Sequence, residues 1–121
     1  MSRHLVILVL ADPSMAERYD RALATVAEQH GVEIELRLCN YPQGTGMSRR
    51  FRQLAAMLRS RAGGSKPTVV ELLRYVRASR PAAGYSTITL ASFSAGYALI
   101  EELLGEHASA LMIDGVVWLD S

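Results

Sequence analysis

One serine in this sequence lies where an expected strand passes directly into an expected helix. The apolar segment 87–93 has the pattern of a β-strand, and the helical pattern after it continues to about Glu106. Between them, Ser92–Gly96 fits the pattern G-x-S-x-G with a serine in place of the first glycine. The central serine of that pattern occupies a strained turn, which exposes its hydroxyl above the edge of the sheet. Ser94 is therefore a candidate catalytic nucleophile.

The residues around Ser94 are small, as a turn of this kind requires. Strand and helix cross closely there, so the positions two before and two after the serine have no room for a branched side chain. The small residues at and near these positions are Ser92, Ala95, Gly96 and Ala98. They favour a sharp strand-to-helix turn at Ser94.

Three further strands are expected along the chain. Leu5–Leu10 is a continuous apolar run, typical of a parallel strand that is covered on both faces. Segment 32–39 alternates between apolar and polar residues, which indicates a half-buried strand at a sheet edge. Segment 111–120 has the pattern of a last strand, with apolar side chains on both faces.

Three helices are expected between these strands. The first opens at Ser14, and the third begins with a capping box, in which Thr68 and Glu71 would satisfy each other's main-chain N–H groups. Apolar residues at helical spacing define the expected core faces. These are Met15, Tyr19, Ala22, Leu23 and Val26 in the first helix, Met47, Phe51, Leu54 and Leu58 in the second, and Val69, Leu72, Leu73 and Val76 in the third.

This alternation predicts a single α/β domain over residues 1–121, with a parallel sheet between helices in three layers, α/β/α. The edge character of the second strand gives the expected strand order 2-1-3-4. The order reverses between the first and third strands, and ligands bind such sheets at that point, beyond the carboxyl ends of the strands. Ser94 and Asp12 both follow carboxyl ends. The motif and the topology therefore both predict that the catalytic site lies at the carboxyl edge of the sheet.

The composition limits the class of protein. Apolar residues make up 50% of the chain, enough for a real core, and a net charge of +1 argues against affinity for nucleic acid. The single cysteine, Cys39, excludes an internal disulfide and offers no metal cluster, so we interpret it as a small buried hydrophobe. Asp12 and Pro13 end the first apolar run as a turn would, and no segment reaches transmembrane length. We expect a cytoplasmic protein without a metal that binds neither nucleic acid nor membrane.

This order of elements resembles the middle of the α/β-hydrolase fold, with its nucleophile elbow, over essentially the whole chain. The resemblance implies that Ser94 is the nucleophile of a serine hydrolase and that the main-chain N–H of Ala95 is one oxyanion-hole donor. The second donor would lie in the loop after the first strand, where Pro13 has no N–H, which leaves Asp12 or Ser14. The expected reaction is hydrolysis of an ester, thioester or amide of a small-molecule or acyl substrate through an acyl-enzyme, without a cofactor.

Three more residues are candidates for the site. Asp120 ends the last strand, where the resemblance implies the catalytic acid, although a loop or helix-capping carboxylate is an equally good interpretation. Phe93 and Tyr97 flank the serine, and they could line an acyl or leaving-group pocket or serve core packing.

The base that would activate Ser94 is harder to assign. His4 begins the first strand, His30 ends a helix and His107 follows the elbow helix, so all three are expected at the amino edge of the sheet. In the family, the catalytic histidine follows a later strand. We therefore expect the amino-terminal half of a hydrolase, either a truncated or cleaved chain or one member of a split pair. The apolar strand 112–119 is expected to pair with that second chain or with a second copy.

A non-catalytic alternative is a flavodoxin-like or pseudo-hydrolase module that binds a partner. It would use the open edge of the last strand and the basic segment 49–66, which contains no acidic residue. The plainer interpretation of that segment, which we prefer, is the solvated side of an amphipathic helix.

Overall fold

Four parallel strands form the centre of the molecule. The computed structural model describes residues 3–10, 13–40, 46–78 and 84–119. Within them the sheet order is β2-β1-β3-β4, with every neighbouring pair parallel. The strands are β1 (Arg3–Leu10), β2 (Glu33–Asn40), β3 (Thr87–Phe93) and β4 (Gly115–Leu119). The strand order 2-1-3-4 expected from the sequence is confirmed.

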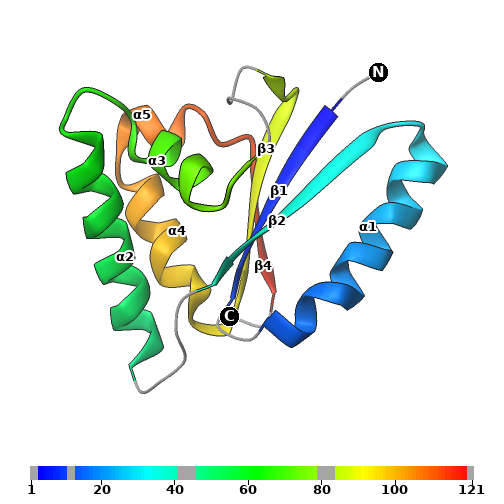
Figure 1. The fold of residues 1–121 in the computed structure, drawn as a ribbon, viewed down its shortest axis with the longest axis horizontal. Coiled ribbons are helices and arrows are strands. Elements are labelled where there is room, and N and C mark those ends of the chain that lie inside the picture. Colours follow the sequence, from blue (N-terminus) through cyan, green and yellow to red (C-terminus); the bar gives the residue numbers. More distant parts are fainter. Residues whose placement is uncertain (1–2, 11–12, 41–45, 79–83, 120–121) are drawn as a thin grey trace.

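Helices cover both faces of the sheet, which makes the fold a three-layer α/β/α arrangement. Figure 1 shows α2 to α5 on one side and α1 on the other. The helices are α1 (Ala16–His30), α2 (Met47–Ala62), α3 (Thr68–Tyr75), α4 (Tyr97–Leu104) and α5 (His107–Ala110). Two 3-10 turns, η1 (Pro13–Met15) and η3 (Ser94–Gly96), lead into α1 and α4.

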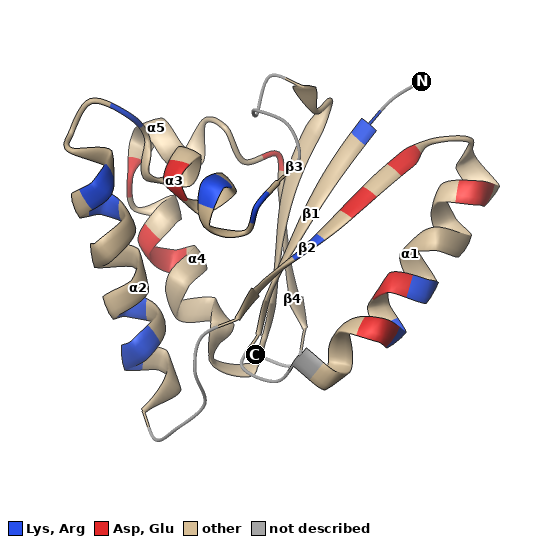
Figure 2. Ribbon diagram, in the orientation of Figure 1, with Lys and Arg blue, Asp and Glu red and all other residues tan. Residues whose placement is uncertain are grey.

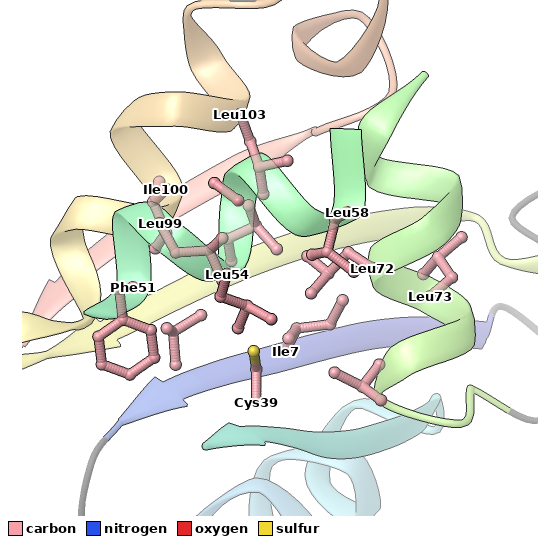
Figure 3. Close-up of a cluster of buried hydrophobic side chains, with 14 of the residues drawn as sticks. Ile7, Cys39, Phe51, Leu54, Leu58, Leu72, Leu73, Leu99, Ile100 and Leu103 are labelled. Atoms are coloured by element: carbon pink, nitrogen blue, oxygen red, sulfur yellow. The ribbon is translucent and has the colours of Figure 1, made fainter. Parts of the chain in front are cut away.

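The larger core lies between the sheet and helices α2, α3 and α4 (Figure 3). Alternate residues of β1 point into it, and most of the expected apolar faces of α2 and α3 are buried there. The side chains without solvent exposure include Leu5, Ile7, Val9, Phe51, Leu54, Leu58, Leu72, Leu90, Leu99 and Leu103. This packing confirms the helical spacing predicted for these two helices.

The α1 side of the sheet is much less completely covered. Among the described residues, its core has three buried members, Leu8, Leu10 and Ala91, and α1 has no buried residue. The expected core face of α1 is therefore wrong in part, because Ala22 is exposed and Val26 is 43% exposed. The reason is position: α1 packs chiefly against the edge strand β2 and leaves the middle of the sheet open on this side.

The last strand is shorter than expected. Asp114 donates its main-chain N–H to the Ile88 carbonyl at 2.8 Å, and its carboxylate accepts the Ile88 N–H at 2.8 Å. This double contact sets the start of β4 at Gly115, so Met112 belongs to the preceding turn and not to the strand. The expectation of apolar side chains on both faces is confirmed, and Val117 and Trp118 are 44% and 49% exposed.

The start of α3 is capped by a distant residue. The Glu106 carboxylate accepts the Thr68 N–H at 2.7 Å and the Thr68 hydroxyl at 2.6 Å, while the Ser109 hydroxyl accepts the Val69 N–H at 3.1 Å. The predicted capping box between Thr68 and Glu71 is wrong, because these tertiary contacts satisfy the first N–H groups of the helix.

Candidate active site

Ser94 lies at the point where β3 ends and the turn into α4 begins. Its φ is +54°, in the left-handed region, which only one other described non-glycine residue, Arg77, also occupies. A non-glycine residue in this region carries about 1–3 kcal/mol of strain, and such strain concentrates at functional sites. Ser94 is an exposed residue. The strained turn predicted from the sequence is confirmed, and the exposure of the residue agrees with the predicted exposed hydroxyl.

Close packing explains why the residues around Ser94 are small. A Cβ on Gly96 would lie 2.2 Å from the Val9 carbonyl oxygen, a distance that no real side chain tolerates. Ser92 and Ala98 have no solvent exposure, because β3 and α4 are both buried against their neighbours there. The turn therefore presses directly against the main chain of β1, which holds Ser94 in place.

Ser94 lies at the carboxyl edge of the sheet, where the parallel strands end. Ser92 lies opposite Val9 of β1 and opposite Trp118 of β4, so Ser94 stands just beyond the ends of both strands. Helix α2 begins at this same edge and packs against the η3 turn. Figure 1 shows the starts of α1, α2 and α4 at this end of the sheet. The start of a helix carries a partial positive charge, which favours a negative charge nearby.

Ala95 is the candidate oxyanion donor of this site. It is the second residue of the η3 turn and is half-buried. The first N–H groups of a helical segment have no acceptor within the helix, so they are available to a bound oxyanion. Asp12 and Asp120 lie outside the described residues, and their roles as oxyanion donor and catalytic acid stay predictions.

The two candidate pocket residues lie on opposite faces of the sheet. Phe93 packs against the cluster of Leu8, Leu10 and Ala91 on the α1 side, whereas Tyr97 packs against the larger core. Both side chains are half-buried. The structure therefore places them on two sides of Ser94, and each also serves core packing.

None of the three histidines of the chain lies near Ser94. His4 is the second residue of β1, where its Nδ1 lies 2.7 Å from the Thr87 hydroxyl. His30 is the last residue of α1 and His107 is the first of α5, and both are exposed. All three lie at the amino edge, as expected, because each helix returns the chain to that edge before the next parallel strand.

The basic segment 49–66 forms ion pairs within the molecule. Arg52 bonds Glu101 at 3.1 Å and Glu102 at 3.3 Å, and Arg59 lies 3.5 Å from Glu102. These contacts raise the pKa of Arg52, chiefly through its hydrogen bond to Glu101. Figure 2 shows the basic residues of α2 facing acidic residues of α4. This partial neutralisation favours the interpretation as the solvated side of a helix.

The thiol and the possible metal ligands among the described residues do not form a second candidate site. Cys39 has no solvent exposure, and burial raises the pKa of its thiol to about 12, which makes it an inert core residue. Within the described ranges, no group of three His, Cys, Asp or Glu side chains could hold a metal ion. No helix in this part of the chain has the length and apolar character needed to cross a membrane.

Sequence reasoning missed one feature near the site, an apolar groove on the α1 side of the sheet. Its volume is about 340 Å³. The alternation of Val6 and Leu8 with core residues of β1 was the available signal, because it predicts apolar side chains on both faces. What the sequence could not show is that α1 leaves part of this face open.

Comparisons of this chain with protein-family models, with curated proteins and with solved structures found no match.

Proposed function

We propose that this chain carries the nucleophile of a serine hydrolase of the α/β-hydrolase type. The observation that supports the proposal is the backbone of Ser94. This exposed serine has a φ of +54° at the carboxyl end of β3, in a turn that packs on the main chain of β1. Strain of this kind clusters at functional sites, and in a nucleophile elbow it accompanies the exposed serine at the strand-to-helix turn.

In the proposed reaction the Ser94 Oγ attacks the carbonyl carbon of an ester, thioester or amide, and its proton passes to a general base. The negative charge on the carbonyl oxygen is stabilised by the Ala95 N–H and by a second donor, Asp12 or Ser14, from the loop after β1. The base then protonates the leaving group, and an acyl-enzyme remains on Ser94. The base then takes a proton from water, which attacks the acyl carbon, and returns a proton to the Ser94 Oγ as the acid is released. Asp120 orients the base in both halves of the reaction.

The base in this proposal is a histidine from outside the chain. The three histidines at 4, 30 and 107 lie at the opposite edge of the sheet, too far to reach Ser94. The edge of β4 supplies a place for the second polypeptide, because Val117 and Trp118 are exposed on a strand that is apolar on both faces. A separate polypeptide or a second copy of the chain would extend the sheet there.

A fluorophosphonate probe tests the proposal, because it labels an activated serine rapidly and an ordinary one slowly. The protein is purified with any polypeptide that associates with it, and the labelled residue is identified by mass spectrometry. We expect rapid labelling at Ser94 that disappears in Ser94→Ala. Rapid labelling at another residue, or no labelling in any assembly, would contradict the proposal.

The second candidate is a flavodoxin-like or pseudo-hydrolase module that binds a partner without catalysis. The observation that favours it is the position of the histidines, all three of which lie at the opposite edge of the sheet from Ser94. A stable complex formed through β4, with Ser94 unreactive in that complex, would support this candidate over the hydrolase.

A further inference from the structure

An apolar groove runs between α1 and the sheet, on the face opposite the larger core. Its volume is about 340 Å³. Among the described helices, α1 alone covers this face (Figure 1). The sheet and the inner side of α1 form its walls, which consist of Val6, Leu8, Tyr19, Ala22, Leu23, Leu36, Thr89, Ala91, Val117 and Leu119.

The lining of the groove is suited to hydrocarbon. Eight of the ten lining residues are aliphatic, the other two are Tyr19 and Thr89, and none is charged. Burying a charged or strongly polar group against such walls is costly, whereas burying methylene groups is favourable. The groove therefore selects an unbranched or weakly branched aliphatic chain over a polar ligand.

The volume of the groove, about 340 Å³, lies at the small end of the range of about 300–1,000 Å³ for small-molecule sites. A volume of this size suits a thin aliphatic chain.

The groove reaches the edge of the sheet at which Ser94 lies. Its lining includes Leu119, which is opposite Phe93 in the register of β3 and β4. Phe93 packs against the cluster that contains the groove residues Leu8 and Ala91, and Ser94 is the next residue in the chain. A ligand whose tail lies along the groove can therefore present its other end at the carboxyl edge, beside the candidate nucleophile.

We propose that this apolar groove holds the aliphatic chain of the acyl group that Ser94 transfers to water. The inference rests on the proposed hydrolase function and names its substrate class, an ester or thioester of a medium- or long-chain fatty acid. Each methylene that enters the groove should strengthen binding by about fourfold, until the groove is filled.

Binding is measured separately from catalysis, so that the two proposals can fail independently. The full 121-residue chain with Ser94→Ala is titrated with cis-parinaric acid, an 18-carbon fatty acid whose fluorescence rises in an apolar site. Ala22→Glu, added to this protein, places a carboxylate at the groove. Ala24→Glu is the matched control, because Ala24 is also exposed on α1 but does not line the groove.

We expect saturable binding of the fatty acid, weakened at least tenfold by Ala22→Glu and unchanged by Ala24→Glu. Saturated fatty acids of 6 to 12 carbons should displace the probe with increasing strength. No binding, or equal binding by both variants, would overturn the inference. Dissociation of a dimer by Ala22→Glu in light scattering, without fatty-acid binding, would also overturn it and would identify the groove as a contact between copies.

Fluorophosphonate labelling of Ser94 is measured in parallel, because it tests the hydrolase proposal independently of fatty-acid binding. Fatty-acid binding in a protein whose Ser94 never reacts would retain the groove site and reject the hydrolase. Rapid labelling of Ser94 in a protein that binds no fatty acid would retain the hydrolase and reject this substrate class.

Discussion

The main chain of Val9 packs directly against Gly96. A Cβ on Gly96 would lie 2.2 Å from the Val9 carbonyl oxygen and 2.8 Å from its carbonyl carbon. These distances leave no room for any side chain, and the neighbouring atoms are main chain that cannot turn aside. The contact joins the end of β1 to the turn that begins at Ser94, so the geometry of the candidate nucleophile depends on it.

The first prediction follows from this contact. Gly96→Ala should lower the free energy of unfolding by about 3 kcal/mol, the upper end of the range for overpacking, because the clash is with main chain. Gly105→Ala is the control, since its Cβ would meet nothing closer than 3.5 Å. That variant should be slightly more stable than the original, by about 0.5 kcal/mol. Urea unfolding measures both, and equal effects of the two substitutions would contradict the packing argument.

The second prediction concerns the strain at Ser94. Ser94→Gly should stabilise the protein by about 0.5–1 kcal/mol, because glycine adopts a positive φ without steric cost. It should also abolish fluorophosphonate labelling, as should Ser94→Ala, which brings no gain in stability. Ser92→Ala should still label, because alanine also fits the close crossing and Ser92 itself has no solvent exposure. Loss of labelling in Ser92→Ala, with Ser94→Ala still reactive, would show that the wrong serine was assigned.

The third prediction is a pH dependence that arises from Glu106. Hydrogen bonds from Ser109 and from Thr68 lower the pKa of this carboxyl group from 4.5 to about 2 in the folded protein. The stabilisation is therefore complete above about pH 4.5, the unfolded value, and is lost as the pH falls toward 2. Glu106→Gln should cost about 1–3 kcal/mol at neutral pH, as for hydrogen bonds to a charged group.

Denaturant unfolding between pH 7 and pH 2.5 tests this dependence. The stability difference between the original protein and Glu106→Gln should narrow as the pH falls. Glu102→Gln is the control, because Glu102 forms exposed ion pairs with Arg52 and Arg59. It should change stability by less than about 1 kcal/mol at neutral pH. A difference that stays constant with pH would mean that the carboxylate does not cap α3.

The fourth prediction concerns the histidines. Replacing His4, His30 and His107 together by glutamine should leave the labelling rate of Ser94 unchanged, because all three lie at the amino edge. Circular dichroism confirms that the variant is folded before its labelling rate is compared. If a single one of these replacements abolished labelling, that histidine would be the base and the proposed external histidine would be wrong.

The fifth prediction concerns assembly through β4. The chain should associate at micromolar concentration, with itself or with a companion polypeptide, because Val117 and Trp118 are exposed on an apolar edge strand. Val117→Lys should prevent the association by placing a charge on that strand. Leu111→Lys is the control, since Leu111 is 73% exposed but precedes β4. Light scattering that shows a well-folded monomer without a companion would contradict the prediction.

Much of the frame around Ser94 could be predicted from the sequence, because it depends on patterns within short segments. The continuous apolar run of β1 and the alternation of β2 predict an inner and an edge strand, which led to the correct strand order. The glycine at position 96 predicts that strand and helix cross closely, and the structure places the main chain of Val9 directly against Gly96. The amino-edge position of the histidines followed from the same parallel topology.

Other features depended on contacts between distant residues, which no short pattern contains. The start of α3 at Thr68 is capped by Glu106, 38 positions later in the chain, and not by the nearby Glu71. The start of β4 is set by the contact of Asp114 with Ile88, 26 positions away. The assignments of Asp12 and Asp120 depend on through-space geometry of the same kind, and they stay predictions.

Helix α1 shows most clearly the difference between what a local sequence pattern determines and what tertiary packing determines. Its sequence has an apolar face, and periodicity alone predicts that this face is buried. How deeply a helix is buried depends on where it lies across the sheet, and α1 packs over the edge strand β2. The sequence by itself determined that α1 is an amphipathic helix beside a parallel sheet. Only the tertiary structure decided that the helix leaves an apolar groove open next to the strand that carries Ser94.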